Sequence, residues 1–199
     1  YEKLLDLVSI YHKDQVLVYE EKWADYLVSQ HKPELAVSHF IEAGKNLKAI
    51  ESAIQSHQFE LALSIMNDTN NLSGYNSNNS IKESIDTLLE HLSNSKQFDQ
   101  AADLYLKIGN IPKAVESLFD GERYTEAFDL SKDHNSNIET TKNYFVERAE
   151  KQIDLGNFST AETIFLAAEA ADKAITTYHR LGRTADCVRL AKIYYPDRL

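Results

Sequence analysis

Histidine and cysteine are the side chains from which a metal or nucleophilic site would be built in this 199-residue sequence. The seven histidines never recur three or four residues apart, the spacing that places two ligands on one face of a helix. No His-Glu-x-x-His motif occurs, and a single cysteine excludes both a disulfide framework and a cysteine-based zinc finger. We therefore expect no metal site and assign the histidines to exposed faces and hairpin ends: His12, His31, His39, His57, His91, His134 and His179.

Motifs of other catalytic sites are also missing from the sequence. It contains no P-loop, no Gly-x-Gly-x-x-Gly and no Gly-x-Ser-x-Gly, and its acidic residues form no Asp-Asp-x-x-Asp cluster. Cys187 occupies a slot that holds alanine in related stretches, so we interpret it as a small packing residue. Trp23 lies in a helical pattern and is interpreted as a core residue. The sequence thus predicts no enzyme activity, no cofactor and no small-molecule substrate.

Composition favours a helical protein that binds other proteins. Hydrophobic residues make up 43% of the chain, enough for a core, whereas 6 glycines and 3 prolines are few for a turn-rich β domain. The formal net charge of -10 disfavours a broad nucleic-acid surface and favours basic or mixed protein partners. No apolar run approaches the roughly 20 residues that span a bilayer, and no secretory signal opens the sequence. A single cysteine suits a reducing compartment.

Three stretches of the chain repeat one pattern of small, aromatic and glycine residues. In each, successive members are separated by 4, 4, 5 and 13 residues. The copies are Ala36, Phe40, Gly44, Ala49, Ala62; then Ala101, Tyr105, Gly109, Ala114, Ala127; and then Ala161, Phe165, Glu169, Ala174, Cys187. We interpret them as the packing positions of a structural repeat.

The spacing predicts a pair of helices in each copy. Ala36 and Phe40 are one helical turn apart, so they share a face. Gly44 and Gly109 fall where a helix should end, at a position that favours positive φ. Asn110 is a candidate N-cap of the next helix, as is Asn46.

The predicted helices cover nearly the whole chain. They are expected at 2–12, 15–30, 34–43, 47–56, 59–66, 81–95, 98–108, 111–119, 123–132, 138–155, 158–168, 172–181 and 184–194. We expect one all-α domain, an α-solenoid over residues 1–199, with repeat periods of about 4–61, 62–126 and 127–186. The Asn-rich stretch 67–80 is predicted to be a flexible insertion, and both ends match the repeat, which indicates a piece of a longer solenoid.

The repeat resembles a lax tetratricopeptide repeat. Trp23, Ala24, Leu27, Ala36, Phe40 and Ala43 fall at spacings like those of that consensus, although the copies alternate between gaps of 26 residues and longer ones. The resemblance implies tetratricopeptide-like helical hairpins in a right-handed superhelix. Such irregular repeats are similar to those of coat-like and ciliary scaffold proteins.

Two stretches resemble the intraflagellar transport protein 172 family. The first runs from Trp23-Ala24-Asp25-Tyr26-Leu27-Val28 to Lys48-Ala49-Ile50-Glu51-Ser52-Ala53, and the second from Gly156-Asn157-Phe158 to Pro196-Asp197-Arg198-Leu199. Glu169 departs from the glycine of the other copies, which leaves the shape of that turn open.

That resemblance implies a non-enzymatic scaffold in the IFT-B complex and a parent protein with WD-repeat propellers. It further implies partners among IFT-B subunits, the IFT-A complex and motors, and a location in the cilium or flagellum and basal body, on the cytoplasmic side. It identifies no partner-binding residue. The alternatives are an IFT-A or vesicle-coat solenoid and a tetratricopeptide co-chaperone that binds peptides.

Overall fold

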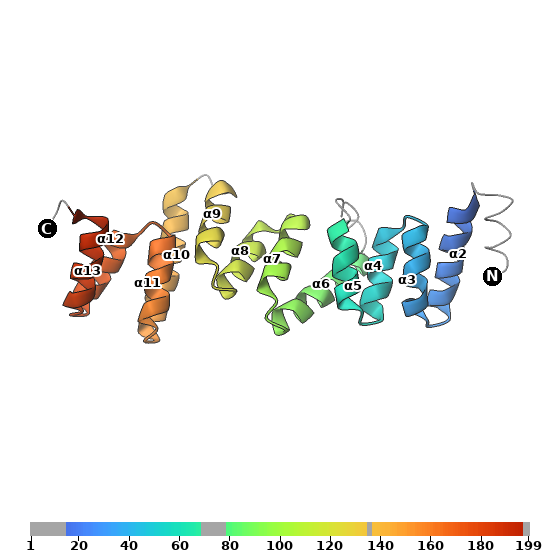
Figure 1. Ribbon diagram of the computed structural model, residues 1–199, viewed down its shortest axis with the longest axis horizontal. Helices are drawn as coiled ribbons and strands as arrows, with labels where there is room; N and C mark the ends of the chain where they lie inside the picture. Colours follow the sequence, from blue (N-terminus) through green and yellow to red (C-terminus); the bar gives the residue numbers. More distant parts are fainter. Residues whose placement is uncertain (1–14, 69–78, 135–136, 197–199) are drawn as a thin grey trace. The chain divides into compact units, whose positions relative to one another are not determined.

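The computed structural model describes residues 15–68, 79–134 and 137–196. Within these residues every regular element is an α-helix, which confirms the predicted all-α class (Figure 1). Family matches to tetratricopeptide-type domains agree with a helical solenoid, and they are given below with the site. None of the helices in the described residues combines the length and hydropathy needed to cross a bilayer.

The chain divides into two compact units, residues 1–96 and 97–199. The described helices of the first unit are α2 (Val16–Ser29), α3 (Pro33–Glu42), α4 (Asn46–Gln55), α5 (Phe59–Asp68) and α6 (Asn79–Asn94). Those of the second are α7 (Phe98–Lys107), α8 (Ile111–Asp120), α9 (Tyr124–His134), α10 (Ile138–Asp154), α11 (Phe158–Ala167), α12 (Ala171–Arg180) and α13 (Thr184–Tyr194). A single continuous solenoid over both units stays a prediction.

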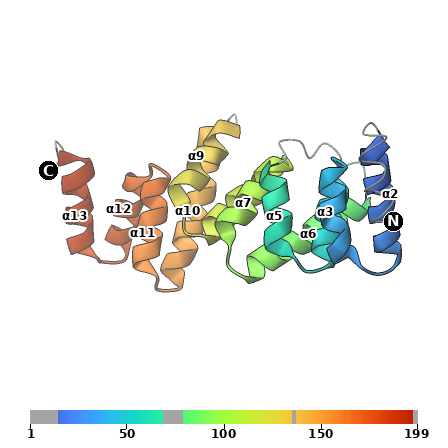
Figure 2. The same ribbon diagram turned by 45° about the vertical axis from the view of Figure 1, so that its right-hand side comes forward.

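Helices that follow one another in the sequence pack side by side within each unit. In the first unit, α2 to α5 pack in sequence and α6 packs on α4; in the second, α7 to α9 and α10 to α13 do so (Figure 1, Figure 2). Every predicted helix from residue 15 onward has a counterpart whose ends differ by no more than two residues. The predicted helix 2–12 and residues 69–78 of the insertion lie outside the described residues, while residues 67, 68, 79 and 80 are helical.

Of the two predicted N-caps, one is confirmed and the other is not. Asn110 is the N-cap of α8, and its side chain accepts a hydrogen bond from the Lys113 N–H, as expected. Asn46, in contrast, is the first residue of α4, and Lys45 occupies the cap without a side-chain hydrogen bond. Two asparagines at nearly equivalent positions of the repeat therefore do not both act as N-caps.

The hairpin turns share one hydrogen-bonding scheme that explains the spacing of the repeat. The carbonyl of the repeat's aromatic residue accepts a backbone hydrogen bond from the residue five positions later: from Lys45 to Phe40 (2.8 Å), from Asn110 to Tyr105 (2.8 Å) and from Ala170 to Phe165 (2.9 Å). The residue before each donor has a positive φ, as this type of helix ending requires. The third copy follows the scheme with Glu169 at φ +54, so a glutamate adopts the turn that Gly44 and Gly109 make elsewhere.

Left-handed turns recur more regularly than any residue type in the sequence. In the part of the chain that the structure describes, residues with positive φ fall into three sets, and the members of each set are 13 positions apart: His31, Gly44 and His57; Lys96, Gly109 and Glu122; Gly156, Glu169 and Gly182. The three turns of each set separate four successive helices. Five of these nine positions are not glycine, so the positions of glycine in the sequence reveal fewer than half of these turns.

Replacing Gly109 by alanine should lower the free energy of unfolding by about 1 kcal/mol, because an L-residue is strained at φ +77. A Cβ atom at Gly109 would meet no heavy atom within 4 Å, so steric clash adds nothing to this cost. Urea denaturation followed by circular dichroism measures the change. Glu122→Ala is the matched control, since Glu122 already adopts φ +61. Equal losses for the two variants would contradict this explanation.

Candidate functional site

The predicted repeat positions lie almost entirely in the interior. Phe40 is 2% exposed, and nine others have no accessible surface: Ala36, Ala49, Ala62, Ala101, Ala114, Ala127, Ala161, Phe165 and Ala174. Tyr105 and Cys187 are half-buried, and the Cys187 thiol lies 3.4 Å from the Ile175 carbonyl. Gly44 and Gly109 form hairpin turns. The buried side chains at these positions therefore lie where helices pack together.

Two of the repeat's aromatic residues have matching surroundings. The ammonium group of Lys48 lies 5.4 Å from the centre of the Phe40 ring, and that of Lys113 lies 5.7 Å from the Tyr105 ring. In both copies the lysine follows the aromatic residue by eight positions. Tyr105 is nevertheless half-buried whereas Phe40 is 2% exposed, and the buried side chain next to it in α7 is Leu104, at 3% exposure.

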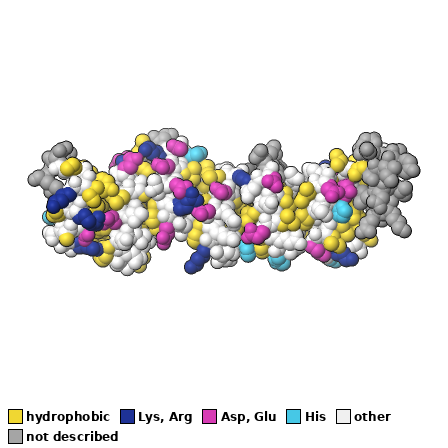
Figure 3. Space-filling model, in the orientation of Figure 1, with side chains coloured by type: hydrophobic (Ala, Val, Ile, Leu, Met, Phe, Trp, Pro, Cys, Tyr) yellow, Lys and Arg dark blue, Asp and Glu magenta, His cyan; other side chains and the backbone are white. Residues whose placement is uncertain are grey.

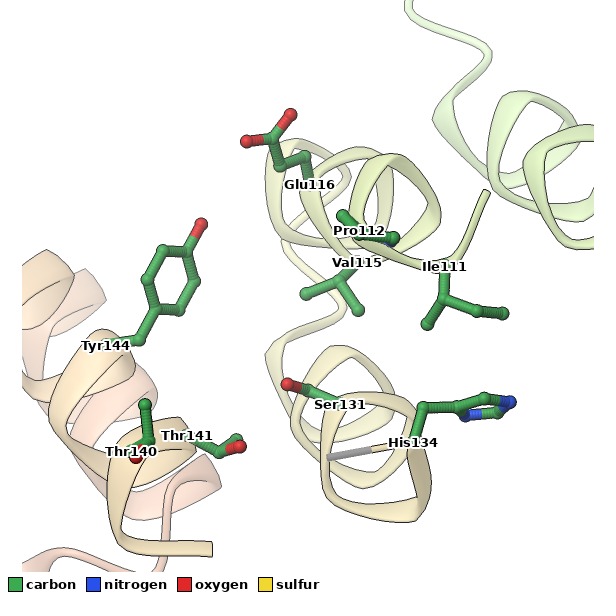
Figure 4. A pocket seen from close by; sticks show the side chains of 9 residues that line it. All are labelled: Ile111, Pro112, Val115, Glu116, Ser131, His134, Thr140, Thr141 and Tyr144. Carbon is green, nitrogen blue, oxygen red and sulfur yellow. The ribbon is translucent and has the colours of Figure 1, made fainter. Parts of the chain in front are cut away.

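A groove of about 570 Å³ lies between α8, α9 and α10 in the second unit. Ile111, Pro112, Val115 and Glu116 line it from α8, Ser131 and His134 from α9, and Thr140, Thr141 and Tyr144 from α10. In Figure 4, Ile111 and Val115 point from α8 toward the α9 side chains, and Thr141 and Tyr144 face them from α10. Its volume is that of a pocket for a small ligand or for a few side chains of a partner.

The groove combines an apolar floor with a polar, accessible rim. Val115 and Thr141 are buried, at 7% and 2% exposure, whereas the Tyr144 ring is 37% exposed. The guanidinium of Arg148 lies 5.1 Å from the Tyr144 ring centre, so a cation–π contact supports the ring at the rim. The carboxylate of Glu116, on the opposite wall, is 4.0 Å from Arg148. This surface suits apolar side chains flanked by hydrogen-bonding groups.

Three of the groove's lining residues carry titratable side chains: Glu116, His134 and Tyr144. The His134 Nδ1–H donates to the Leu130 carbonyl at 3.1 Å, which stabilises the last turn of α9. The exposed Tyr144 and Glu116 side chains beside the buried Val115 fit a binding surface.

A smaller hollow of about 220 Å³ lies over α11, α12 and α13 and is dominated by ion pairs. Arg189 contacts the Glu162 carboxylate at 2.6 Å and Asp186 at 3.3 Å. The Tyr178 hydroxyl donates to the Phe158 carbonyl at 3.0 Å. Burial, followed by the nearby Glu162 carboxylate, raises the pKa of Tyr178 to about 12, so it stays protonated. These groups satisfy one another and fix the helix contacts.

In the first unit, two histidines, His39 and His91, are half-buried and so depart from the exposed positions predicted for them. His39 of α3 is 25% exposed, and its Nδ1 atom lies 2.6 Å from the buried Glu20 carboxylate of α2. The Trp23 ring lies edge-on to the His39 ring, with centroids 6.3 Å apart, and stacks on Tyr26 at 5.3 Å. Trp23 was predicted to be a core residue, and in the structure it is half-buried. Sequence reasoning missed the pair because Glu20 and His39 are on different helices.

An ion-pair cluster lies beside this pair on the accessible surface. The Lys48 ammonium contacts Glu21 at 3.0 Å and Asp25 at 2.9 Å, and Lys45 contacts Glu21 at 3.1 Å. Hydrogen bonds from Lys48 and then Lys45 lower the pKa of the Glu21 carboxyl. In Figure 3, acidic side chains are scattered between hydrophobic ones on the face in view. Exposed ion pairs of this kind contribute little to the free energy of unfolding, so the main effect of the cluster is on the distribution of charge over this part of the surface.

Comparison with known proteins places the whole chain among helical-repeat proteins. The family model described as the GEMI5 TPR domain matches residues 69–194, and the model described as the ELP1 TPR domain matches residues 1–129. Each match covers more than half of the chain.

Curated relatives share the sequence over its full length. Intraflagellar transport protein 172 homolog of Danio rerio is 28% identical over 199 residues, which are 100% of this chain. Intraflagellar transport protein osm-1 of Caenorhabditis elegans is 28% identical over 202 residues, and the Homo sapiens 172 homolog is 26% identical over 99% of the chain. The chain spans 11% of the length of each of these relatives.

Proposed function

The chain belongs to the tetratricopeptide-type helical domains of the GEMI5 and ELP1 kind, and from this premise we propose that it is a non-catalytic protein-interaction scaffold in intraflagellar transport. The observation that carries the proposal is the match of the whole chain to relatives named intraflagellar transport protein 172. Helical hairpins of this family stack into extended surfaces, which suit binding of other proteins.

The finer role that we propose is that of an IFT-B subunit segment. In it, the chain helps assemble transport trains in the cilium or flagellum and at the basal body, and contacts other IFT-B subunits, IFT-A and motors. The similarity to named intraflagellar transport proteins supports this role. The net charge of -10 favours partners whose contact surfaces carry basic residues beside apolar ones.

The groove between α8, α9 and α10 is the surface of the second unit that we propose for such a partner. Its accessible Tyr144 ring offers the kind of amphipathic aromatic contact that dominates many interfaces. The Glu116 carboxylate, 58% exposed, adds an acidic group at the rim for a basic partner side chain. A helical partner segment with apolar and basic residues matches both features.

A chimaera tests the transport role. The segment of Caenorhabditis elegans osm-1 that matches this chain is replaced by the chain, and the chimaera is expressed in animals that lack osm-1. We expect cilia of near-normal length and a tagged chimaera that moves along them. The control chimaera carries a tetratricopeptide segment of a protein unrelated to transport. Failure of the chain to restore cilia, with normal protein levels, would contradict the proposal.

Tyr144→Ala tests the groove separately in the same chimaera. Truncation of an interface aromatic costs about 2 kcal/mol or more at a binding hot spot, so co-purification of the groove's partner should fall by about 30-fold. Tyr105→Ala is the matched control, because Tyr105 is a partly exposed tyrosine of α7 that does not line the groove. Equal partner recovery with both variants would place the contact elsewhere and leave the transport role intact.

A further inference from the structure

We propose that Glu20, His39 and Glu42 form a binding site for a divalent transition-metal ion, Zn²⁺, on the α2–α3 hairpin. One possible ligand atom from each side chain lies within 4.8 Å of the other two. His39 and Glu42 are three residues apart on α3, so both project from one face of that helix, and Glu20 approaches from α2. The site therefore joins two helices through their side chains.

Because Glu20 is buried, a positive charge close to its carboxylate would stabilise it. Glu20 is 6% exposed, and its carboxylate lies 2.6 Å from His39 Nδ1. A buried carboxylate is costly unless it is paired with a positive charge or coordinates a metal. An imidazole provides that charge only when it is protonated, whereas a zinc ion provides it with the imidazole neutral.

The present arrangement is close to the geometry of a bound ion. Zinc binds histidine nitrogen and carboxylate oxygen at about 2.0–2.2 Å in a tetrahedron, which places ligand atoms about 3.4 Å apart. The three ligand atoms lie within 4.8 Å of one another, so the ligands must close by at most about 1.4 Å. Glu42 is exposed and its side chain can rotate to make this movement, while the Glu20–His39 contact opens slightly.

The ligand set favours zinc over calcium or magnesium. One imidazole and two carboxylates suit a transition metal, whereas calcium takes six to eight oxygen ligands and magnesium a nearly ideal octahedron. Helix pairs in other bundles hold metals with glutamate and histidine three residues apart. Three protein ligands leave the fourth position of the ion for water. Binding should stabilise the hairpin, because the ion links α2 to α3.

The test uses the full 199-residue chain without a histidine tag, since a tag would itself bind the metal. Titration calorimetry with ZnCl₂ should show saturable binding of one ion per chain. Cobalt(II), as a spectroscopic substitute, should give the visible absorption of a tetrahedral site and quench Trp23. That residue is the one tryptophan of the chain, and its ring centre lies 6.3 Å from that of His39.

Glu42→Gln is the main variant, because its exposed position allows the change without loss of folding. Loss of a partner of a metal ligand weakens binding about 10–100-fold, so loss of a ligand should weaken it by at least that factor. His39→Gln should act likewise, with circular dichroism as the check on its fold. His179→Gln is the matched control, because His179 is at an exposed position of α12. This variant should bind zinc as the unchanged chain does.

Two results would overturn the proposal. One is the absence of saturable zinc binding by the unchanged chain at neutral pH. The other is unchanged affinity, with unchanged cobalt absorption and Trp23 quenching, in both Glu42→Gln and His39→Gln. In the second case the ion binds other residues, and the Glu20–His39 contact is an ion pair or hydrogen bond alone.

Discussion

Replacing Phe145 by alanine should lower the free energy of unfolding by about 3–5 kcal/mol, the largest loss expected for any single change considered in this chain. Phe145, in α10, has no accessible surface. Its ring contacts those of Phe119 and Phe128 edge-on, with centroids 5.6 Å and 5.4 Å apart. Removal of the ring leaves a cavity where three helices meet, and neighbours in a packed core relax only partly into such a space.

The aromatic contacts add to the cost of that cavity. Edge-to-face pairs contribute about 0.5–1.5 kcal/mol beyond the area that they bury, and Phe145 takes part in two with buried rings. Urea denaturation followed by circular dichroism at 222 nm measures the effect. Tyr144→Ala is the control, because it removes an adjacent aromatic side chain that is 37% exposed. A loss below about 1 kcal/mol for Phe145→Ala would mean that the cluster does not hold α8, α9 and α10 together.

Replacing Ala101 by phenylalanine should destabilise the second unit by about 1–3 kcal/mol through overpacking. Ala101 has no accessible surface, and its helix α7 packs against α8. A phenyl ring at that place must push the helices apart or adopt a strained rotamer. The small residue at this repeat position is thus expected to set how closely the two helices approach.

Asp103→Phe is the matched control for Ala101→Phe, since Asp103 lies on the exposed face of the same helix. It introduces the same ring, without a neighbour to displace, and should change stability by no more than about 0.5 kcal/mol. Thermal melting of the two variants and of the unchanged chain gives the comparison. Equal melting temperatures for Ala101→Phe and the unchanged chain would show that the alanine positions do not limit helix packing.

The helices could be predicted well because each depends on local signals. Alternation of apolar residues at helical spacing placed α2 to α13 to within two residues of their bounds. Capping was less predictable. Asn46 was predicted to cap α4 but is its first residue, whereas the Asn137 side chain caps α10 by accepting from the Glu139 and Thr140 N–H groups at 3.1 Å and 3.3 Å. The type of residue near a helix start therefore does not by itself identify the cap.

The turn at Glu169 could not be predicted from residue type. A glutamate at positive φ costs more than a glycine there, so the sequence left the turn open. In the structure, Lys132 of α9 and Lys142 of α10 contact the Glu169 carboxylate at 3.2 Å and 3.5 Å. The pKa of this carboxyl is lowered, mainly by the hydrogen bond from Lys132. In this copy, the glutamate at the turn forms ion pairs with two other helices, whereas in the other two copies the turn residue is glycine.

The amino-acid sequence by itself determined the all-helical class, the helix bounds and the recurring small and aromatic residues, because these follow from contacts within about one or two helical turns. Only the tertiary structure decided which side chains from separate helices meet. The groove at Tyr144 needs α8, α9 and α10 together, and the Glu20–His39 contact joins residues 19 positions apart. No local pattern records such contacts, since they depend on how the helices pack.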